Sequence, residues 1–103
     1  MSELVKICPT SEVADNSVKS FEVGNNVIAV YNLGGTFYAT DNECTHAYAM
    51  LTDGTVDGEV IVCPLHGGAF EIKTGKGLGA PIFCDVKCYP TRVSGANVEV
   101  QVD

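Results

Sequence analysis

The residues of this sequence whose types and spacing could carry chemistry are two cysteine–histidine pairs. The first pair is Cys44-Thr45-His46, the second is Cys63-Pro64-Leu65-His66, and residues 47 to 62 separate them. These pairs contain both histidines of the chain and two of its five cysteines. Thiolates and imidazoles are the ligands that proteins offer to zinc and to iron–sulfur centres. The side chains of Cys44, His46, Cys63 and His66 are therefore the candidate metal ligands.

Two kinds of metal centre fit this four-ligand set. Structural zinc takes two cysteines and two histidines in a tetrahedron, whereas a [2Fe–2S] cluster of mixed ligation takes two cysteines on one iron and two histidines on the other. A classical zinc finger pairs Cys with Cys and presents both His from a helix, but here each segment supplies one of each. A binuclear centre suits this pattern, because each loop then reaches both irons. Zinc stays the alternative, and colour with a metal assay separates the two.

Histidine ligation also determines how easily such a centre accepts an electron. Two ferric irons, two sulfides and two thiolates sum to zero charge, and neutral histidines add nothing. An all-cysteine cluster is already negative before reduction, so an added electron meets more repulsion. The mixed ligand set therefore predicts a higher reduction potential than that of an all-cysteine cluster.

The composition narrows the classes of partner and compartment. The formal charge is −7 and only six residues are basic, so we expect no nucleic acid partner. The longest apolar runs, 27–31 and 47–51, are too short to span a membrane, and the N-terminus lacks the pattern of a secretion signal. An odd number of cysteines without such a signal favours metal binding over a disulfide framework. We therefore expect a cytoplasmic protein.

The hydrophobic pattern predicts a single all-β domain over residues 1–103. Alternating or β-branched runs separated by Gly and Asn turns are typical of an antiparallel sandwich or barrel, and turns are expected at Asn32-Leu33-Gly34-Gly35 and at Ser94-Gly95-Ala96-Asn97. One helical turn is expected within 11–16, capped by Thr10 or Ser11, and Pro90 is expected to break a strand. The expected strands are 4–7, 20–23, 27–31, 36–40, 59–62, 69–73, 85–89, 91–93 and 98–102.

The chain resembles the Rieske ferredoxin family over nearly its whole length. The pattern Cys-x-His, a gap of residues 47–62 and Cys-x2-His is specific to that family, and the order of the expected strands fits it. The residues that carry the resemblance are Cys44-Thr45-His46, Leu51-Thr52-Asp53-Gly54, Cys63-Pro64-Leu65-His66-Gly67-Gly68-Ala69-Phe70, Thr74-Gly75 and Gly79-Ala80-Pro81.

The resemblance implies an architecture and a function. The fold would be an antiparallel β-sandwich base, residues 1–40 and 84–103, with a cluster-binding loop subdomain inserted at about 41–83. Cys44 and Cys63 would bind one iron of a [2Fe–2S] cluster, and His46 and His66 the other. The likeness is to the small ferredoxins of bacterial ring-hydroxylating dioxygenase systems. These are not enzymes but one-electron carriers that pass electrons from an NAD(P)H-dependent flavoprotein reductase to a terminal oxygenase.

Two other functional classes stay open beside this one. The first is a small Rieske subunit held permanently in a larger oxidoreductase, and the second is a zinc-stabilised interaction module. A monomer that docks transiently with both partners favours the free carrier. A stable complex in the native host favours the permanent subunit. The aromatic substrate of such a system is a property of the oxygenase and is not encoded here.

Departures from the Rieske proteins of respiratory complexes imply a low potential. Those proteins resemble this motif but add a cysteine to each loop, and the two form a disulfide. Ala49 and Leu65 stand at these positions, and Gly68 replaces a serine whose hydroxyl donates to a cluster sulfide. With one donor fewer, we expect a potential near the low end of the Rieske range, roughly −150 mV.

Several residues around the ligands carry secondary expectations. Cys8, Cys84 and Cys88 have no nearby histidine and are expected to be small buried hydrophobes. The glycines after residue 73 are expected to serve turns. An apolar collar of Tyr48, Leu65, Pro81 and Ile82 is one expected docking surface. The other is an acidic rim that steers partners and consists of Asp41, Glu43, Asp53 and Asp57.

Overall fold

The computed structural model describes residues 3–24, 26–43, 49–64, 68–78 and 85–102, and every strand pairing in it is antiparallel. The strands form three sheets with the orders β1-β10-β9, β2-β3-β4-β8 and β5-β6-β7. This confirms the predicted all-β class. The elements are β1 (Glu3–Pro9), η1 (Thr10–Glu12), β2 (Ser17–Val23), β3 (Asn26–Leu33), β4 (Thr36–Asp41), η2 (Leu51–Asp53), β5 (Thr55–Asp57), β6 (Val60–Val62), β7 (Ala69–Glu71), β8 (Cys88–Tyr89), β9 (Thr91–Ser94) and β10 (Asn97–Val102).

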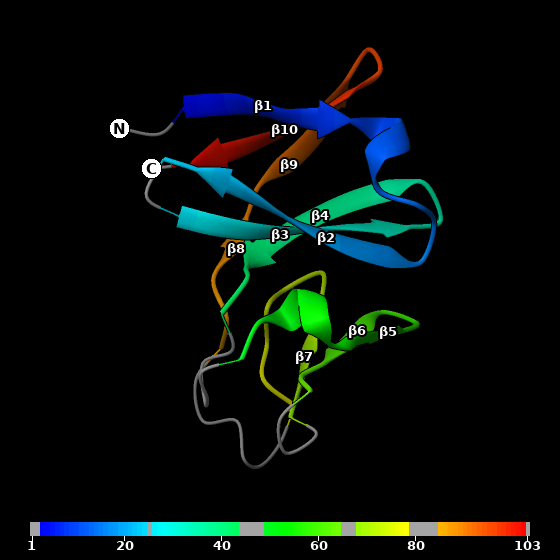
Figure 1. Cartoon of the computed structure of the whole chain (residues 1–103), viewed down its shortest axis with the longest axis vertical. Coiled ribbons are helices and arrows are strands. Elements are labelled where there is room, and N and C mark those ends of the chain that lie inside the picture. The colour runs from blue at the N-terminus through cyan, green and yellow to red at the C-terminus, as the bar shows by residue number, and fades with distance from the viewer. Residues whose placement is uncertain (1–2, 25, 44–48, 65–67, 79–84, 103) are drawn as a thin grey trace.

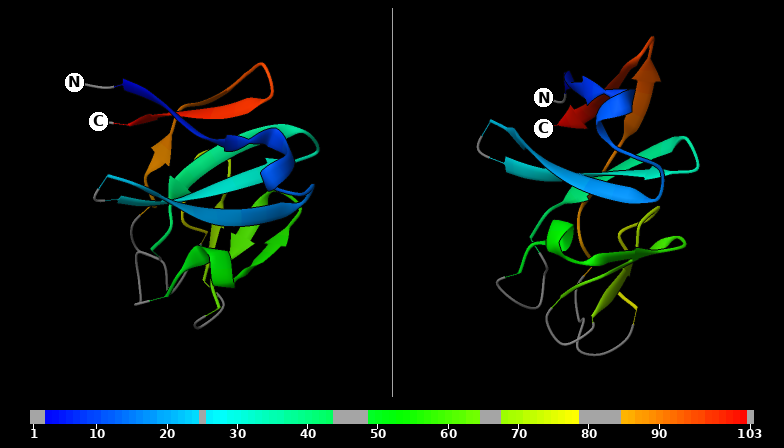
Figure 2. Two further views of the ribbon diagram at one scale, coloured as in Figure 1. Left: turned by 45° about the horizontal axis from the view of Figure 1, so that its top comes forward. Right: turned by 45° about the vertical axis from the view of Figure 1, so that its right-hand side comes forward.

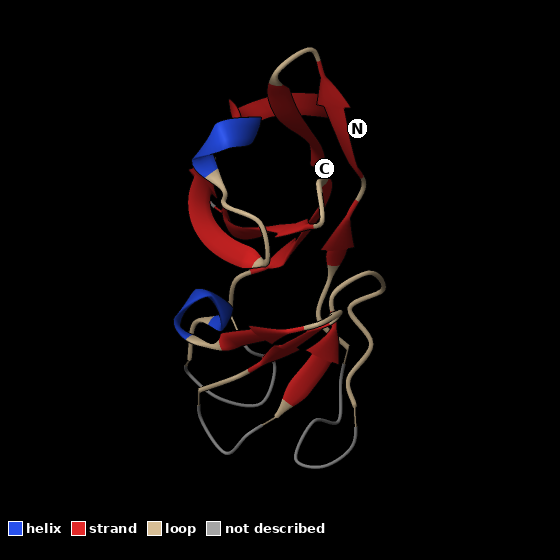
Figure 3. Ribbon diagram, turned by 90° about the vertical axis from the view of Figure 1, so that its right-hand side faces the viewer, coloured by secondary structure: helices blue, strands red, loops and turns tan. Residues whose placement is uncertain are grey.

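The four-stranded sheet is the middle of three layers, as Figures 1 and 3 show from two directions. Ile28 and Val30 of β3 pack into a core shared with β10 of the first sheet. Ala29 and Tyr31, on the other face of β3, pack into a second core shared with β6 and β7. All four side chains are fully buried. A strand that is buried on both faces need not alternate, which explains the continuous apolar run at 27–31.

The pairing register confirms the predicted hairpin turns. Leu33 pairs with Thr36 across a turn of Gly34 and Gly35, both with positive φ, and Asn97 pairs with Ser94. At Pro90 the chain leaves the middle sheet, where β8 pairs with β4, and enters the first sheet, where β9 pairs with β10. Proline has no amide hydrogen for a ladder, so it suits this corner between sheets.

The structure corrects the prediction in five places, and the first is the 3-10 turn η2, which the sequence pattern did not predict. The sequence pattern missed β5, a short strand whose residues Thr55, Val56 and Asp57 pair with β6. β7 ends at Glu71, because a turn follows in which Gly75 N–H donates to the carbonyl of Glu71 at 2.7 Å. β8 is only Cys88–Tyr89 rather than 85–89. The helical turn is a 3-10 turn over Thr10–Glu12, and no side chain caps it.

The third sheet and the loops around it come from the middle of the chain. β5, β6 and β7 follow β4 and precede β8 in sequence, and they lie below the middle sheet in Figure 1. Both chain termini lie near the opposite end, beside the β1-β10-β9 sheet (Figures 1 and 2). Within the described residues, neither short helix has the length and hydrophobicity needed to cross a bilayer.

Candidate iron–sulfur cluster site

Hydrogen bonds join the two ends of the first cysteine–histidine segment. The residues that make these bonds, 42–43 and 50–51, are called the first neck. Asn42 follows β4, and its amide donates to the carbonyl of Val27 at 3.1 Å. Glu43 and Met50 form an antiparallel bridge, and the amide of Leu51 donates to the carbonyl of Asn42 at 2.6 Å. The structure thus brings together the two ends of the segment that carries the first pair. Cys44 and His46 themselves lie outside the described residues, as does Tyr48 of the expected collar.

The second segment begins at Cys63, just after β6. Residues 62–63 and 68–69, which pair at its two ends, are called the second neck. The amide of Cys63 donates to the carbonyl of Gly68 at 2.6 Å, and Val62 pairs with Ala69 where β7 begins. The chain therefore leaves the sheet after Val62 and enters it again at Ala69. Cys63 is 1% exposed. His66 and Leu65 lie outside the described residues.

The two necks lie against each other. Thr55, just after η2, pairs with Val62, just before Cys63. Gly54 approaches so closely that a Cβ there would lie 2.0 Å from the carbonyl oxygen of Val62. Ala49 and Cys63 belong to the same hydrophobic cluster. The fold therefore places the bases of the two predicted ligand segments side by side.

A third segment is anchored beside them at both ends. The amide of Leu78 donates to the carbonyl of Ala69 at 2.9 Å, and the amide of Val86 donates to the carbonyl of Gly75 at 2.8 Å. Asp85 accepts a further bond from the amide of Gly77 at 2.9 Å. Pro81 and Ile82 of the collar, and Cys84, lie between these anchors and outside the described residues.

The donor set fits a [2Fe–2S] cluster at the one ligand position that the structure describes. Cys63 is buried, and no disulfide includes it. It stands at the base of the segment that also carries His66, next to the neck from which Cys44 and His46 extend. A cluster held between two loops requires two adjacent loop bases, and this is the arrangement found.

The remaining described cysteines have structural surroundings. Cys8 is 4% exposed in the core of the upper two sheets, which confirms it as a small buried hydrophobe. Burial, and secondarily the negative charge of Glu12, raises the pKa of its thiol. Cys88 is half-buried, its thiol makes a weak 3.8 Å bond to the carbonyl of Ile72, and burial raises its pKa as well. Neither thiol forms a disulfide, and the described part of the chain holds no group of three or more His, Cys, Asp or Glu side chains that could bind a metal.

The expected acidic rim is only partly available to partners. Glu43, Asp53 and Asp57 are exposed. Asp41 is half-buried, and its carboxylate accepts a hydrogen bond from the hydroxyl of Tyr89. Asp41 therefore holds β4 to β8 and is a poor candidate for steering.

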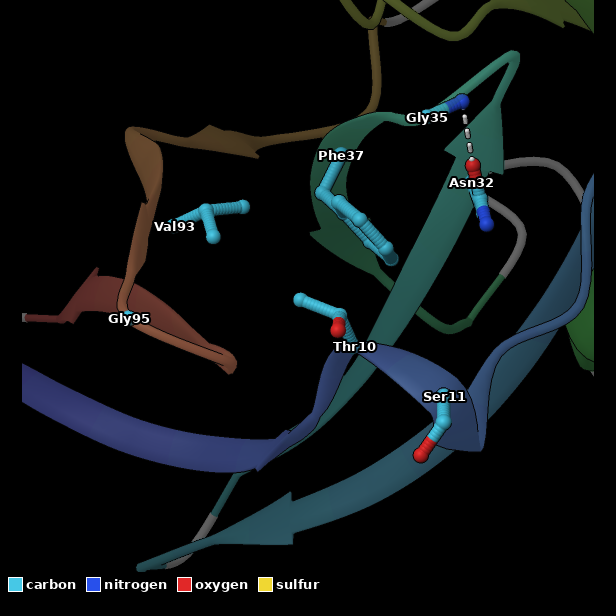
Figure 4. Close-up of a pocket in the computed structure, with 7 residues that line it drawn as sticks. All are labelled: Thr10, Ser11, Asn32, Gly35, Phe37, Val93 and Gly95. Atoms are coloured by element: carbon cyan, nitrogen blue, oxygen red, sulfur yellow. Dashed lines mark hydrogen bonds between the residues drawn. The ribbon is translucent and has the colours of Figure 1, made fainter.

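A cavity at the other end of the molecule carries no ionisable side chain. It has a volume of about 390 Å³ and opens between η1, the β3–β4 turn and the β9–β10 turn, as Figure 4 shows. Its lining residues are Thr10, Ser11, Asn32, Gly35, Phe37, Val93 and Gly95. This composition gives it no catalytic or metal-binding chemistry.

Comparison with known proteins gives the class. The family described as Rieske [2Fe-2S] domain matches residues 3–90. The ferredoxin component of a naphthalene 1,2-dioxygenase system from Pseudomonas putida is 40% identical over 93 residues, which are 90% of this chain and 88% of that protein. The solved ferredoxin of Sphingomonas yanoikuyae B1 is 36% identical, with a TM-score of 0.92, 98% of this chain covered and 100% of that one. A ferredoxin solved in complex with the oxygenase of carbazole 1,9a-dioxygenase is 38% identical, with a TM-score of 0.87 and coverages of 94% and 91%.

The chain belongs to the Rieske [2Fe–2S] family. It is a ferredoxin of the kind found in ring-hydroxylating dioxygenase systems, with a Rieske-type [2Fe–2S] cluster as its cofactor. Its function is electron transport toward a terminal oxygenase, and the oxygenation reaction belongs to that partner rather than to this chain.

Sequence reasoning did not identify Asn42 as part of this site. Asn42 is a buried polar residue, 3% exposed, that closes the first neck. Its position two residues before Cys44 was the available signal, because polar residues close to metal ligands often hold those ligands in place by hydrogen bonds.

Proposed function

We propose that Cys44, His46, Cys63 and His66 hold the cluster, and that residues of about 41–83 form the cluster-binding unit on a β base. The observation that supports this most directly is the adjacency of the two necks, with the buried thiol of Cys63 at the base of one of them. When bound, the cluster takes up and releases one electron at a time. The chain's own residues hold the bases of the loops together and exclude water from Cys63.

The proposed ligand set is tested by paired cysteine variants. We expect Cys63→Ser to abolish cluster assembly, because a serine hydroxyl is a much poorer ligand for iron than a thiolate. Cys8→Ser is the matched control, since Cys8 is also buried but lies in the upper core. Visible absorbance, iron and sulfide content and the electron paramagnetic resonance signal of the reduced protein report assembly. Cys44→Ser and His66→Ala are expected to behave like Cys63→Ser.

Three outcomes contradict this ligand set. If the Cys63→Ser protein retained the electron paramagnetic resonance signal of a mixed-ligand cluster, Cys63 would be excluded as a ligand. If Cys8→Ser lost the signal while the protein stayed folded, the cluster would depend on Cys8, which is not in the proposed ligand set. A colourless wild-type protein with one zinc per chain would favour the interaction module.

For the electron route, we propose an NAD(P)H-dependent flavoprotein reductase as donor and a terminal Rieske oxygenase as acceptor. The ferredoxin relatives of dioxygenase systems support this proposal. We expect NADH with catalytic amounts of such a reductase to bleach the oxidised chain, and added oxygenase to reoxidise it. Stopped-flow absorbance measures both steps. A chain that the reductase cannot reduce, although dithionite can, would exclude this class of donor.

We further propose that the carrier is a cytoplasmic monomer that docks transiently with each partner. A carrier that bound either partner tightly would stall between electron transfers, so its interface should be small and weak. Free thiols at Cys8, Cys63 and Cys88 are compatible with a reducing compartment. Co-purification of a stoichiometric complex at high dilution would instead favour the permanent subunit.

A further inference from the structure

Asn42, which follows β4, hydrogen-bonds both to β3 and to η2 with its N-cap residue. Its backbone amide donates to Val27 of β3 at 3.1 Å, and its carbonyl accepts from Leu51 at 2.6 Å. Its side-chain oxygen accepts from the amide of Thr52 at 3.1 Å, and its side-chain nitrogen donates to the sulfur of Met50 at 3.5 Å. Both polar side-chain atoms of a residue that is 3% exposed are thus used.

These bonds replace the missing cap of helix η2. The first amides of a helix have no partner within it and are usually satisfied by a nearby side chain at the N-cap. The N-cap residue of η2 is Met50, which makes no side-chain cap bond. Asn42 satisfies the first two donors instead, Leu51 through its carbonyl and Thr52 through its side chain. The Asn42 side chain therefore adds two bonds to the Glu43–Met50 bridge and the Leu51–Asn42 backbone bond, which also join the two sides of the first ligand segment.

We propose that Asn42 is a positioning residue for the cluster: it holds the neck closed and thereby sets the placement and retention of the ligands Cys44 and His46. This inference rests on the proposed ligand set. Loss of the side chain leaves the Thr52 amide without its acceptor, so the neck opens more often. A looser neck lets the first pair of ligands move relative to the second pair, whose first member, Cys63, lies just after β6.

Asn32 provides a matched control within the same protein. It is also buried, 9% exposed, and its side chain likewise makes two hydrogen bonds. Its nitrogen donates to the carbonyl of Val13 at 2.9 Å, and its oxygen accepts from the amide of Gly35 at 2.8 Å (Figure 4). These partners lie at the β3–β4 turn and the segment after η1, away from the necks. Asn32→Ala and Asn42→Ala therefore remove equal numbers of bonds at two different places.

The test compares iron release and the cluster's spectroscopic properties in the two holoproteins. Release to excess bathophenanthroline is followed at a temperature where circular dichroism shows both variants folded. We expect Asn42→Ala to release iron about tenfold faster than wild type, as one unpaired buried amide implies, and Asn32→Ala to stay within about twofold. We also expect Asn42→Ala alone to shift the midpoint potential and the g-values of the reduced cluster. A purely structural role would lower the unfolding midpoint of both variants and leave these two properties unchanged.

A second variant keeps the test decisive if Asn42→Ala yields no holoprotein. Asn42→Asp retains an oxygen acceptor for Thr52 but loses the donor to Met50 and adds a negative charge at a buried position, so it should release iron faster than both wild type and Asn32→Ala. Equal release from wild type, Asn32→Ala and whichever Asn42 variants form the holoprotein would overturn the inference. If Cys63→Ser still holds the cluster, the proposed ligand set fails instead, so the two failures are distinguishable.

Discussion

At the scale of single residues, burial alone does not distinguish Cys63, a proposed ligand, from Cys8, which is not one of the proposed ligands. Both are almost fully buried and neither forms a disulfide. Cys8 is surrounded by the aliphatic side chains of the upper core, whereas Cys63 lies where two chain segments turn back on themselves. The difference lies in the loops around each thiol rather than in its exposure.

Gly68 offers a direct way to tune the potential. It is buried, and its carbonyl accepts the amide of Cys63. We expect Gly68→Ser to raise the midpoint potential, because a hydroxyl there would donate to a cluster sulfide and stabilise the reduced state. Protein-film voltammetry measures the change. Gly68→Ala is the control for the added Cβ, and equal potentials in the Ser and Ala variants would exclude a hydroxyl donor at this position.

Tyr31 is expected to limit stability at alkaline pH. Its side chain is fully buried, its hydroxyl bonds Thr40 at 2.9 Å, and burial raises its pKa above the ordinary value of 10.0. Above about pH 10 the unfolded chain loses a proton that the folded chain keeps, so the free energy of unfolding falls as pH rises, by up to about 1.4 kcal/mol per pH unit for this group.

Denaturant titrations between pH 8 and about 11 check this expectation. In Tyr31→Phe, the free energy of unfolding should decrease less steeply with pH in the alkaline range. At neutral pH it should be lower than in wild type by about 1 kcal/mol, because the hydrogen bond to Thr40 is lost. Tyr38→Phe, on the neighbouring strand and only partly buried, should leave the fall in place. An alkaline fall that is identical in wild type and Tyr31→Phe would assign it to other groups.

At the scale of elements, the turn after β7 anchors the third segment of the site. Gly75 in this turn has φ +78 and is buried, and its carbonyl accepts the amide of Val86. A Cβ at this position would lie 2.1 Å from the carbonyl oxygen of Val86 and 3.1 Å from the sulfur of Cys88. The turn therefore requires glycine for two reasons, its backbone conformation and the close approach of the 85–88 segment.

A comparison of Gly75→Ala with Gly95→Ala separates the effect of the backbone conformation from that of the close contact. Gly95 also has a positive φ, +62, but nothing lies within 4 Å of a Cβ there. We expect Gly95→Ala to lower the free energy of unfolding by about 1 kcal/mol, the penalty for an L-residue in this conformation. Gly75→Ala should lower it by roughly 3 kcal/mol or more, because backbone must also move. Thermal unfolding of both variants measures the difference, and equal losses would mean that the 85–88 segment yields freely.

At the scale of the whole molecule, the negative charge is divided between the end with the cluster site and the base. The formal charge is −7, and Glu43, Asp53 and Asp57 are exposed acids in or next to the necks. With the cluster held by the proposed ligands, electron transfer would require docking through that end, since tunnelling falls off steeply with distance. Exposed acids at the docking face would attract partners with basic patches and make association depend on salt.

Neutralising acids at the two ends tests this steering. We expect the triple variant Glu43→Gln, Asp53→Asn, Asp57→Asn to transfer electrons to its oxygenase several-fold more slowly at low salt, with a flatter dependence on ionic strength. The control neutralises three exposed acids of the base, Glu12, Asp15 and Glu22, and removes the same charge. Stopped-flow rates against salt measure both. Rates that do not depend on salt in wild type would exclude steering and leave the apolar collar as the docking surface.

The sequence alone determined the chemistry of this protein, because ligand type and spacing are local properties. Cys44, His46, Cys63 and His66 could be singled out from their residue types and separations, and the family follows from the residues around them. The hairpins at Gly34-Gly35 and Gly95 could be predicted for the same reason, since turn conformation depends on a few adjacent residues.

Only the tertiary structure decided how the layers and necks are assembled. The middle sheet is covered on both faces, β5 exists by pairing with β6, and the chain changes sheet at Pro90. Asn42 meets Val27 and Thr52, which are far from it in sequence, and Gly75 meets Val86. Such contacts depend on how separate segments pack, and no local pattern of hydrophobicity or propensity encodes that packing.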